Sequence, residues 1–482
     1  MLAGMMLAAF AMTPMNPPKP LPRARPSEVG VDARGVTAFL DALNAADLEP
    51  HGFMLVRKGK VVAEGTWDPY KAETPHMLYS LSKSFTSTAV GLAIHEGLFA
   101  LDDPVIKFFP DDLPAEISPN LRAMRVRDLL TMTCGHESEP QVRAVADGNW
   151  AKGFLAHPVP RKPGSHFVYN SLSTYMAGAI VQKLTGKTLL EYLRPRILEP
   201  LGIVDGGWDS DPRGLNVGGW GLNVTLESIA KFGQLYLQRG VWQGKRLIPE
   251  SWVALATSKQ VENGTDPNND WNQGYGFQFW RCRHNGYRGD GAFGQFCIVL
   301  PDQDAVLAIT SGHHDMGLVM ELAWKHLLPA MGKSADKAGE AELLKRLGSL
   351  ELRPRGVQPP SDLERAIHNT TYRVTQGDSA KAVRLEFAPN QVTLWLDDAP
   401  LRAGRADWFR QTSAIGFGQP RPLAAKATWR TATELAIKAC DVETPGSFTV
   451  SLKFEADRVN VAVDRLATFM PGEGPRLVAS RR

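Results

Sequence analysis

Hydrophobic and polar residues follow a strand-like pattern at both ends of the first two thirds of the chain. The apolar runs 52–56 and 61–65 flank Lys58-Gly59-Lys60, which predicts a β-hairpin turning at Gly59. The runs 296–300 and 306–309 flank a Pro-Asp-Gln-Asp segment and predict a second hairpin. Helical spacing dominates between them. We therefore expect an antiparallel sheet assembled from both ends of this region, with helices packed against it.

Several apolar stretches between the hairpins have the spacing of amphipathic or buried helices. The predicted helices cover residues 27–43, 80–97, 127–135, 174–184 and 226–237, and a further helix opens at Glu250. Residues 261–274 are rich in Asn, Asp and Gly, which predicts a long loop and a candidate lid.

The pattern changes near residue 333. Residues 338–347 have a charged helical pattern, and the proline-rich residues 353–360 predict a linker. Beyond it, short runs with strand-like texture predict seven or eight strands, and therefore a small β-sandwich or barrel. These runs are 372–374, 383–387, 392–396, 428–429, 435–438, 448–454 and 459–463. The aromatic residues of this region are expected to lie mainly in its core, and they are Trp395, Trp408, Phe409 and Trp429.

The composition narrows the class of protein. A chain of 482 residues is too long for one core and indicates two or three domains. It is 43% hydrophobic and 22% charged, as in ordinary soluble proteins. The net charge of +3 comes without a long basic run, so no nucleic-acid partner is expected. No stretch is long and apolar enough to predict a membrane span.

The N-terminus bears on localisation. Residues 1–12 are apolar but lack the positive segment and the cleavage site of a secretory signal, and six prolines follow before residue 27. We expect a flexible segment over residues 1–25 and a cytoplasmic protein. A signal truncated by a wrong start site, and hence a periplasmic or secreted protein, is the alternative.

Cysteine and histidine usage gives no sign of a metal or cofactor. The four cysteines are scattered without a C-x-x-C pair, so neither a zinc site nor a disulfide framework is predicted. The eleven histidines show no ligand spacing, and the adjacent pair His313-His314 would point to opposite sides of a strand. We expect the protein to need no cofactor.

A Ser-x-x-Lys motif, formed by Ser80 and Lys83, stands at the head of a predicted long helix. Three residues make close to one helical turn, so the Lys83 ammonium can lie beside the Ser80 hydroxyl. Serine needs a neighbouring base to become a nucleophile, and a lysine with a lowered pKa can serve. Alone the motif is weak evidence, because serine is also common as a helix cap.

Tyr169-Asn170-Ser171 is the second polar cluster. A tyrosine beside Lys83 would have its phenolate favoured by the ammonium, and could then carry protons. Asn170 and Ser171 could orient that tyrosine or the substrate. A tyrosine and an asparagine in an ordinary turn is the simpler interpretation.

An oxyanion needs preorganised donors. The backbone N–H of Ser80 is one candidate. The second would come from the glycine-rich residues 289–295, interpreted as a sheet-edge strand that a substrate can approach closely. A glycine bulge without function is the alternative.

Taken together, these motifs resemble the serine β-lactamase and penicillin-binding-protein superfamily. The class C β-lactamase-like branch is the best match, and within it the carboxylesterases and 6-aminohexanoate-dimer hydrolases. The motifs that carry the resemblance are Ser80-Leu81-Ser82-Lys83, Tyr169-Asn170-Ser171 and Asp290-Gly291, supported by residues 129–133, 218–222, 275–280 and 291–295. The resemblance extends over residues 26–328 and leaves out the C-terminal β region.

The resemblance implies an α+β fold, with a β-lactamase/transpeptidase-like antiparallel sheet flanked by helices and an all-helical subregion. It implies that Ser80 is acylated and that Lys83 and Tyr169 share the general base and acid work. Ser80 and Ala292 would donate the oxyanion hydrogen bonds. The remaining substrate-binding candidates are Asn170, Ser171, Asp290 and Gly291.

Two departures from the family pattern affect the expected substrate. Ser171 stands where the lactamases carry Asn, and Asp290 takes the place of the lysine that helps hold a substrate carboxylate. Because like charges repel, we expect weak or no hydrolysis of penicillins and cephalosporins. Arg288 is near and could supply the positive charge instead.

The leading hypothesis is therefore a serine hydrolase of small carboxylic esters. An amidase or D-amino-acid peptidase of the same mechanism, or a catalytically idle binding protein on this fold, are the alternatives. The expected segments are residues 26–332 for the hydrolase domain, 333–360 for a helix and linker, and 361–482 for a C-terminal β domain. That last domain could bind a carbohydrate or lipid, or shield the active-site mouth and the sheet edge.

Overall fold

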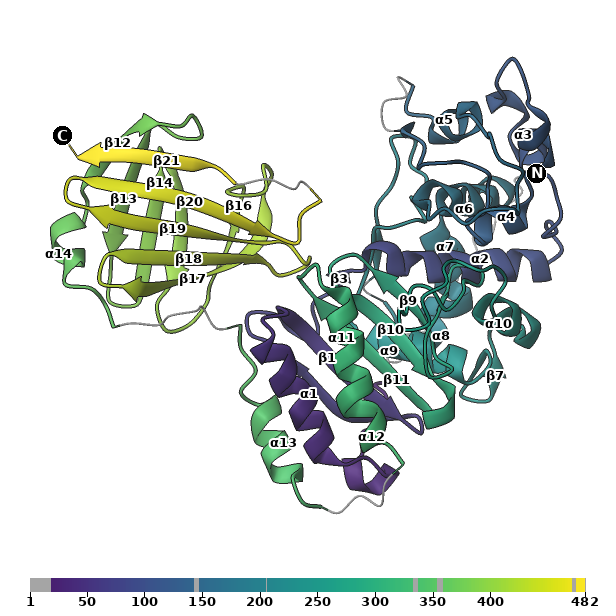
Figure 1. Ribbon diagram of the computed structural model, residues 1–482, viewed down its shortest axis with the longest axis horizontal. Coiled ribbons are helices and arrows are strands. Elements are labelled where there is room, and N and C mark those ends of the chain that lie inside the picture. The colour runs from purple at the N-terminus through teal and green to yellow at the C-terminus, as the bar shows by residue number, and fades with distance from the viewer. Residues whose placement is uncertain are drawn as a thin grey trace, which may run out of the picture.

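A computed structural model describes residues 19–142, 147–204, 206–332, 337–352, 359–469 and 474–481. Most of the expected flexible segment, and residues 353–358 of the expected linker, lie outside the described residues. A six-stranded sheet with helices on both faces lies beside a separate sheet made by the C-terminal residues (Figure 1). The fold class predicted from the sequence is confirmed by this arrangement.

The first sheet joins the two ends of residues 26–332, as predicted. Its strand order is β2-β1-β11-β10-β9-β8, and every neighbouring pair is antiparallel. Phe53 pairs with Ile309, and Ile309 also pairs with Phe296. The strands are β1 (Pro50–Arg57), β2 (Lys60–Thr66), β8 (Trp280–Arg281), β9 (Tyr287–Gly291), β10 (Gln295–Leu300) and β11 (Ala305–Ser311).

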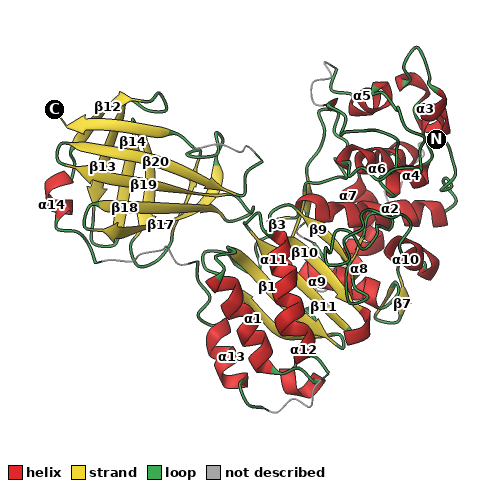
Figure 2. Cartoon of the chain, in the orientation of Figure 1, coloured by secondary structure: helices red, strands yellow, loops and turns green. Residues whose placement is uncertain are grey.

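Helices cover both faces of this sheet (Figure 2). Phe53 and Leu55 face one apolar core, which they share with the first and last helices of the region. Met54 and Val56 face the other core, which contains α2 and α9. The first set is α1 (Ala33–Ala45), α11 (Met316–Leu322), η8 (Ala323–Leu327), α12 (Leu328–Ala330) and α13 (Glu340–Leu347). Because both faces are covered, β1 is buried along its whole length.

The central helix α2 (Ser82–His95) is almost entirely buried, and it shares one apolar core with α9 (Leu226–Leu237). Phe85 of α2 stacks on Phe232 of α9 with ring centroids 3.8 Å apart. Thr225 caps α9 by accepting the Ser228 N–H, as its position before an apolar run predicts.

A mainly helical subregion separates α2 from α9. Its helices are α3 (Pro119–Ala123), α4 (Val126–Leu130), α5 (Trp150–Ala156), α6 (Ser171–Thr185), α7 (Leu189–Leu193), η6 (Arg194–Leu198) and α8 (Glu199–Leu201). The helix predicted over residues 127–135 is shorter than expected. Helix α4 ends at Leu130, and Met132 has φ +60, which is not a helical conformation. The remaining elements are η1 (Pro26–Val29), β3 (His76–Met77), η2 (Tyr79–Leu81), η3 (Val105–Phe108), η4 (Pro110–Asp112), β4 (Gly207–Trp208), β5 (Leu222–Val224), β6 (Val241–Trp242), β7 (Lys245–Arg246), α10 (Glu250–Thr257) and η7 (Pro301–Gln303).

The C-terminal residues form a closed barrel, one of the two predicted forms. Nine strands close through the pairing of β15 with β17, and β16 extends the sheet beyond β17. The elements are α14 (Leu363–Ile367), β12 (Thr371–Gln376), β13 (Ala382–Phe387), β14 (Gln391–Leu396), β15 (Ala399–Gly404), β16 (Phe409–Ser413), β17 (Arg421–Thr431), β18 (Glu434–Asp441), β19 (Ser447–Glu455), β20 (Arg458–Leu466) and β21 (Arg476–Arg481). Sequence reasoning missed β15, β16 and β21, whose exposed and polar positions blur the strand pattern.

The barrel packs directly against the first sheet. Trp408, Cys440 and Val442 of the barrel belong to the same buried apolar cluster as Trp67 and Tyr70. Polar contacts surround this seam, where Glu49 accepts hydrogen bonds from Lys438 and Ser447, and Arg410 donates to Pro69 O. The two parts therefore share one core rather than meeting only through the connecting residues.

None of the helices in the described part of the chain is both long and apolar enough to cross a lipid bilayer.

Candidate active site

Ser80 lies in the short turn η2, immediately before α2. The preceding residue, Tyr79, has φ +46, a backbone conformation that a bulky residue rarely adopts and that clusters at functional sites. Leu78 N donates to Leu222 O, and Ser82 Oγ accepts the Leu222 N–H, so both sides of the turn are tied to β5. The predicted helix thus begins two residues after Ser80, which is presented on a tight turn at its amino end.

Lys83 is 2% exposed, and its Nζ lies among three oxygens. It donates to Ser80 Oγ at 2.9 Å, to Ser171 Oγ at 3.2 Å and to Gly219 O at 2.7 Å. Burial lowers the pKa of Lys83 to about 7, although the charges of Glu139 and Asp290 oppose the shift. At neutral pH a large fraction of Lys83 is therefore an uncharged amine with a lone pair beside the Ser80 hydroxyl.

The Gly219 carbonyl was not singled out by sequence reasoning. A Cβ at Gly219 would lie 2.5 Å from Ser171 O, so only glycine lets this loop reach the lysine. The neighbouring Gly218 carbonyl accepts from Thr86 Oγ1 at 2.8 Å, which fixes the loop on α2. The Gly-Gly-Trp-Gly sequence was the available signal, because paired glycines mark close backbone approach.

Tyr169 faces Lys83 and stacks on Trp280. The Lys83 Nζ lies 5.0 Å from the Tyr169 ring centroid, and the Trp280 ring centroid lies 5.4 Å away at an interplanar angle of 21°. The residue is 36% exposed, yet burial of its phenol, together with the Asp290 charge, raises the pKa of Tyr169; a hydrogen bond with Ser80 partly opposes the shift.

The expectation that Lys83 favours the phenolate form of Tyr169 is therefore wrong. Its stabilisation would require a permanently charged lysine, and burial lowers the pKa of Lys83 to about 7 instead. Tyr169 stays a phenol at neutral pH, which suits it to donate a proton and to relay one, rather than to act first as a base.

Asn170 and Ser171 divide into two structural roles. The Asn170 side chain is buried, caps α6 by accepting from Leu172 N and Ser173 N, and contacts His136 Nδ1. Its polar atoms are thus used within the protein. Ser171 is the first residue of α6, and its Oγ lies 3.2 Å from Lys83 Nζ. Ser171 orients the lysine.

Asp290 is not an isolated carboxylate. Its Oδ2 accepts a hydrogen bond from Arg288 Nε at 2.9 Å, and both side chains are buried. Burial raises the pKa of Asp290, and Arg288 opposes that shift. The Arg288 guanidinium lies over the rings of Trp271 and Trp280, at 4.6 and 5.6 Å from their centroids. We expected the Asp290 charge alone to repel a substrate carboxylate. That expectation is corrected, because the charges of Asp290 and Arg288 form an ion pair.

Strand β9 packs against the Ser80 turn through its glycines. A Cβ at Gly291 would lie 2.0 Å from Leu78 O and 3.1 Å from Ser80 N, and one at Gly289 would lie 2.5 Å from Ser84 Oγ. The expected edge strand over 289–295 is wrong in two respects. The strand ends at Gly291, with residues 292–294 forming the turn into β10, and the short β8 lies outside it. Ala292 is thus presented at the end of β9, next to the Ser80 backbone.

Within the described ranges, no three His, Cys, Asp or Glu side chains gather closely enough to ligate a metal ion. The four cysteines are free and buried. His313 is buried beyond the end of β11, while its neighbour His314 is exposed. The two side chains therefore point in different directions, as expected. They do not belong to a strand, because β11 ends at Ser311.

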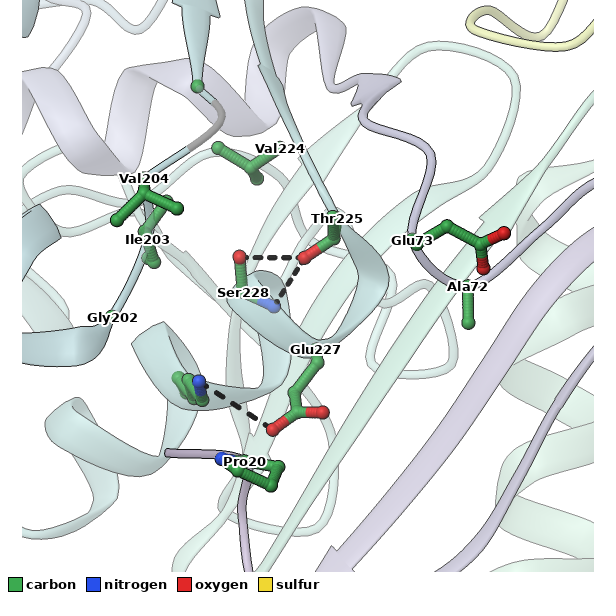
Figure 3. Close-up of a pocket in the computed structure, with 12 residues that line it drawn as sticks. Pro20, Ala72, Glu73, Gly202, Ile203, Val204, Val224, Thr225, Glu227 and Ser228 are labelled. Atoms are coloured by element: carbon green, nitrogen blue, oxygen red, sulfur yellow. Dashed lines mark hydrogen bonds and ion pairs between the residues drawn. The ribbon is translucent and has the colours of Figure 1, made fainter. Parts of the chain in front are cut away.

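A hollow of about 310 Å³ on the described surface lies away from this site (Figure 3). Glu227 and Ser228 at the start of α9 form one side of it, and Ala72 and Glu73 form another. None of its lining residues is Ser80, Lys83, Tyr169 or Ala292. Its size therefore does not mark the catalytic position.

Comparison with known proteins agrees with this geometry. The sequence profile of the Beta-lactamase family matches residues 39–327, which is more than half of the chain. This chain belongs to the beta-lactamase family. The resemblance inferred from the three motifs is thereby confirmed, and the matched residues contain the Ser80 turn, Tyr169 and β9.

Relatives of this beta-lactamase-family chain include hydrolases of esters and amides. It is 26% identical to the 6-aminohexanoate-dimer hydrolase of Paenarthrobacter ureafaciens over 285 residues, which cover 55% of this chain and 72% of that protein. It is also 26% identical to Esterase EstB of Burkholderia gladioli over 215 residues, 38% of this chain and 55% of EstB.

Solved structures support the fold alone, because their sequence identities are low. The octameric penicillin-binding protein homologue from Pyrococcus abyssi has a TM-score of 0.50 at 17% identity, and the match covers 92% of this chain and 99% of that one. A penicillin-binding protein homologue from Caulobacter crescentus also has a TM-score of 0.50, at 20% identity, and the match covers 62% and 99% of the two chains. The first of these matches extends well beyond the family profile toward the C-terminus.

Proposed function

We propose that this beta-lactamase-family protein hydrolyses small carboxylic esters through a covalent acyl-Ser80 intermediate. The observation that carries the proposal is the position of the Lys83 amine, 2.9 Å from Ser80 Oγ, with a pKa lowered to about 7 by burial. A buried amine beside a serine hydroxyl is costly to maintain and suits a general base.

In the acylation step, neutral Lys83 takes the proton of Ser80 Oγ while that oxygen bonds to the ester carbonyl carbon. The carbonyl π bond opens, and its oxygen becomes the oxyanion. The backbone N–H groups of Ser80 and Ala292 are proposed to donate to it. Gly291 makes this arrangement sterically possible, because it lets β9 approach the Ser80 turn.

Collapse of the tetrahedral intermediate breaks the bond to the alcohol oxygen, which needs a proton to leave. We propose that the Tyr169 phenol donates it and is reprotonated from the Lys83 ammonium, whose Nζ lies 5.0 Å from the Tyr169 ring centroid. A water then attacks the acyl carbon and gives a proton to the neutral Lys83. The second tetrahedral intermediate collapses by breaking the bond to Ser80 Oγ, which takes that proton back from the Lys83 ammonium, and the carboxylic acid leaves.

The charge of the site supports neutral substrates. Arg288 is buried and paired with Asp290, so it offers no free cation comparable to the lysine of the lactamase pattern. Benzylpenicillin, which carries a carboxylate, is therefore proposed to be a poor substrate. Small neutral esters need no such partner.

An amidase is the second candidate function. It is favoured by the match to a 6-aminohexanoate-dimer hydrolase, which covers 72% of that protein. Amide cleavage demands stronger protonation of the leaving nitrogen, and Tyr169, with its raised pKa, is the only donor we propose for that step. Comparing p-nitrophenyl butyrate with the corresponding butyranilide measures this preference.

The test combines intact-mass labelling by a fluorophosphonate with hydrolysis of p-nitrophenyl butyrate. Wild type is expected to gain one adduct and to turn over the ester, and Ser80→Ala is expected to lose both. Ser251→Ala, at an exposed position on α10, is the control and should keep the adduct. An unlabelled wild type would favour the idle binding protein, and an adduct that persists in Ser80→Ala would assign another nucleophile.

A further inference from the structure

The barrel reaches the catalytic turn through one aromatic side chain. Phe469, which follows β20, has its ring centroid 5.6 Å from that of Tyr79 and 4.7 Å from that of Phe293. The rings of Tyr79 and Phe293 are themselves 5.3 Å apart and meet edge to face. The three rings thus contact one another, although they come from three distant parts of the sequence. We refer to Tyr79, Phe293 and Phe469 as the aromatic triad.

The triad adjoins both proposed oxyanion donors. Tyr79 directly precedes Ser80, and Phe293 directly follows Ala292. Tyr79 and Phe293 have φ values of +46 and +66, which bulky residues rarely adopt. A positive φ at a bulky residue costs free energy, and it persists only where the surrounding contacts hold the backbone in that conformation. The triad therefore lies at the place where the carbonyl group of a substrate would be held.

The barrel that carries Phe469 is docked on the sheet by direct contacts next to the Ser80 turn. The Met77 N–H, three residues before Ser80, donates to Glu443 O of the barrel at 2.8 Å (Figure 1, around β3). Tyr70 OH donates to Thr444 O in the same seam. Because the barrel shares a buried core with the sheet, the ring of Phe469 is carried on a docked body.

The exposure of Phe469 points to a ligand. The residue remains 68% exposed although its ring touches two others, so most of its apolar surface is free to be covered. A single exposed hydrophobic residue needs no explanation by itself. Here the exposed ring is the outer member of a cluster whose inner members flank the catalytic serine and the Ala292 backbone.

We propose that Phe469 of the barrel forms a wall of the acyl subsite and selects esters with bulky apolar acyl groups. This inference rests on the proposed function of Ser80. Once the carbonyl oxygen lies between the Ser80 and Ala292 backbones, an acyl chain of several carbons extends over the triad and covers Phe469. Acetyl esters are too short to reach it. The barrel thereby takes part in substrate choice without supplying a reacting group.

The experiment measures kcat/KM of the full-length protein for p-nitrophenyl acetate, butyrate, octanoate and 4-phenylbutyrate. Phe469→Ala is expected to lower the ratio of octanoate to acetate by about tenfold or more, since it removes apolar contact available only to the longer chain. Phe469→Leu should retain part of the preference. Leu344→Ala is the matched control, because Leu344 is 71% exposed on α13 and should leave the ratio unchanged.

Two results would overturn the inference. An unchanged ratio in Phe469→Ala shows that the side chain does not contact the acyl group. An equal fall for all four esters shows that Phe469 only positions the Ser80 turn. Fluorophosphonate labelling separates this failure from that of the proposed function. Labelled Ser80 with an unchanged ratio rejects the acyl wall alone, whereas no labelling in any variant rejects both.

Discussion

The Nζ of Lys83 lies 2.9 Å from the Oγ of Ser80, and burial brings the pKa of that amine to about 7. The base is active when it is uncharged. We therefore expect kcat/KM for a neutral ester to rise tenfold per pH unit below pH 7 and to level off above it. A pH–rate profile from pH 5 to 9 with an uncharged substrate measures this. An inflection near pH 10 would mean that the pKa of the base is not lowered, and a flat profile would mean that Lys83 is not the base.

Removal of the lysine side chain is expected to slow acylation. Lys83→Ala should reduce the rate of fluorophosphonate labelling by about 10²–10⁴-fold, the usual range for a general base. Lys231→Ala is the matched control, because Lys231 is also buried but lies on α9, paired with Glu227 at 3.6 Å. It should label at the wild-type rate. A small effect of Lys83→Ala would transfer the role of base to Tyr169.

The glycine of β9 that touches the Ser80 turn should tolerate no side chain. In Gly291→Ala the new Cβ would lie 2.0 Å from Leu78 O, so β9 must move away and carry the Ala292 N–H with it. Loss of one oxyanion donor costs about 10²–10³-fold in kcat, and we expect a fall of at least this size. Gly207→Ala, at a strand position with open space around it, is the control. Normal turnover by Gly291→Ala would exclude this oxyanion geometry.

The buried pair of Asp290 and Arg288 should stabilise the fold only as a pair. Asp290→Asn leaves the Arg288 charge buried without a counter-ion, and we expect the free energy of unfolding to fall by about 3–5 kcal/mol. The exposed pair of Lys453 and Glu455 provides the comparison, where Glu455→Gln should leave the free energy of unfolding almost unchanged, because water screens the two charges. Urea unfolding of both variants measures this difference. Equal losses would show that Arg288 finds other compensation.

Acid should destabilise the seam beside the barrel. His51 Nδ1 lies 3.1 Å from His76 Nε2, and Tyr70 stacks on His51. Burial lowers the pKa of His76 to about 4 and that of His51 well below 6.5, with Lys438 and His313 adding to the shift at His51. The unfolded chain then binds more protons than the folded one between about pH 6.5 and pH 4. Stability should fall as the pH decreases through that range.

Urea unfolding at pH 7.5, 5.5 and 4.5 tests this expectation. His76→Gln removes one of the two imidazoles and should lose less stability on acidification than wild type. His166→Gln changes an exposed histidine and should follow the wild-type profile. If His76→Gln and wild type have the same pH slope, another group governs the acid sensitivity.

Much of the fold could be predicted from local pattern. The hairpin turning at Gly59 and the one after Leu300 follow from turn residues between apolar runs, and their strands are confirmed. The choice between a sandwich and a closed barrel could not be made from the sequence, because closure depends on the pairing of Gly404 with Lys426, which no local pattern encodes.

The candidate site could be predicted in its residue types but not in its electrostatics. Ser80 and Lys83 follow from helical spacing, whereas the pKa of Lys83 depends on burial by segments far along the chain. The phenol state of Tyr169 and the pairing of Asp290 were mistaken for the same reason, since desolvation is a tertiary effect. The contact of Phe469 with Tyr79 had no sequence signal at all.

The pairing of Phe53 with Ile309 means that the central sheet joins the start of the hydrolase region to its end. During synthesis, β1 and the Ser80 turn leave the ribosome long before β9, β10 and β11 exist. At a translation rate of about 5–20 residues per second, that interval is on the order of tens of seconds. Throughout it, β1, which is buried along its whole length in the folded protein, can pair with β2 on one side but not with β11 on the other, and the turn lacks the glycine strand that packs against it. The nascent chain is thus inactive and aggregation-prone until the sheet can close.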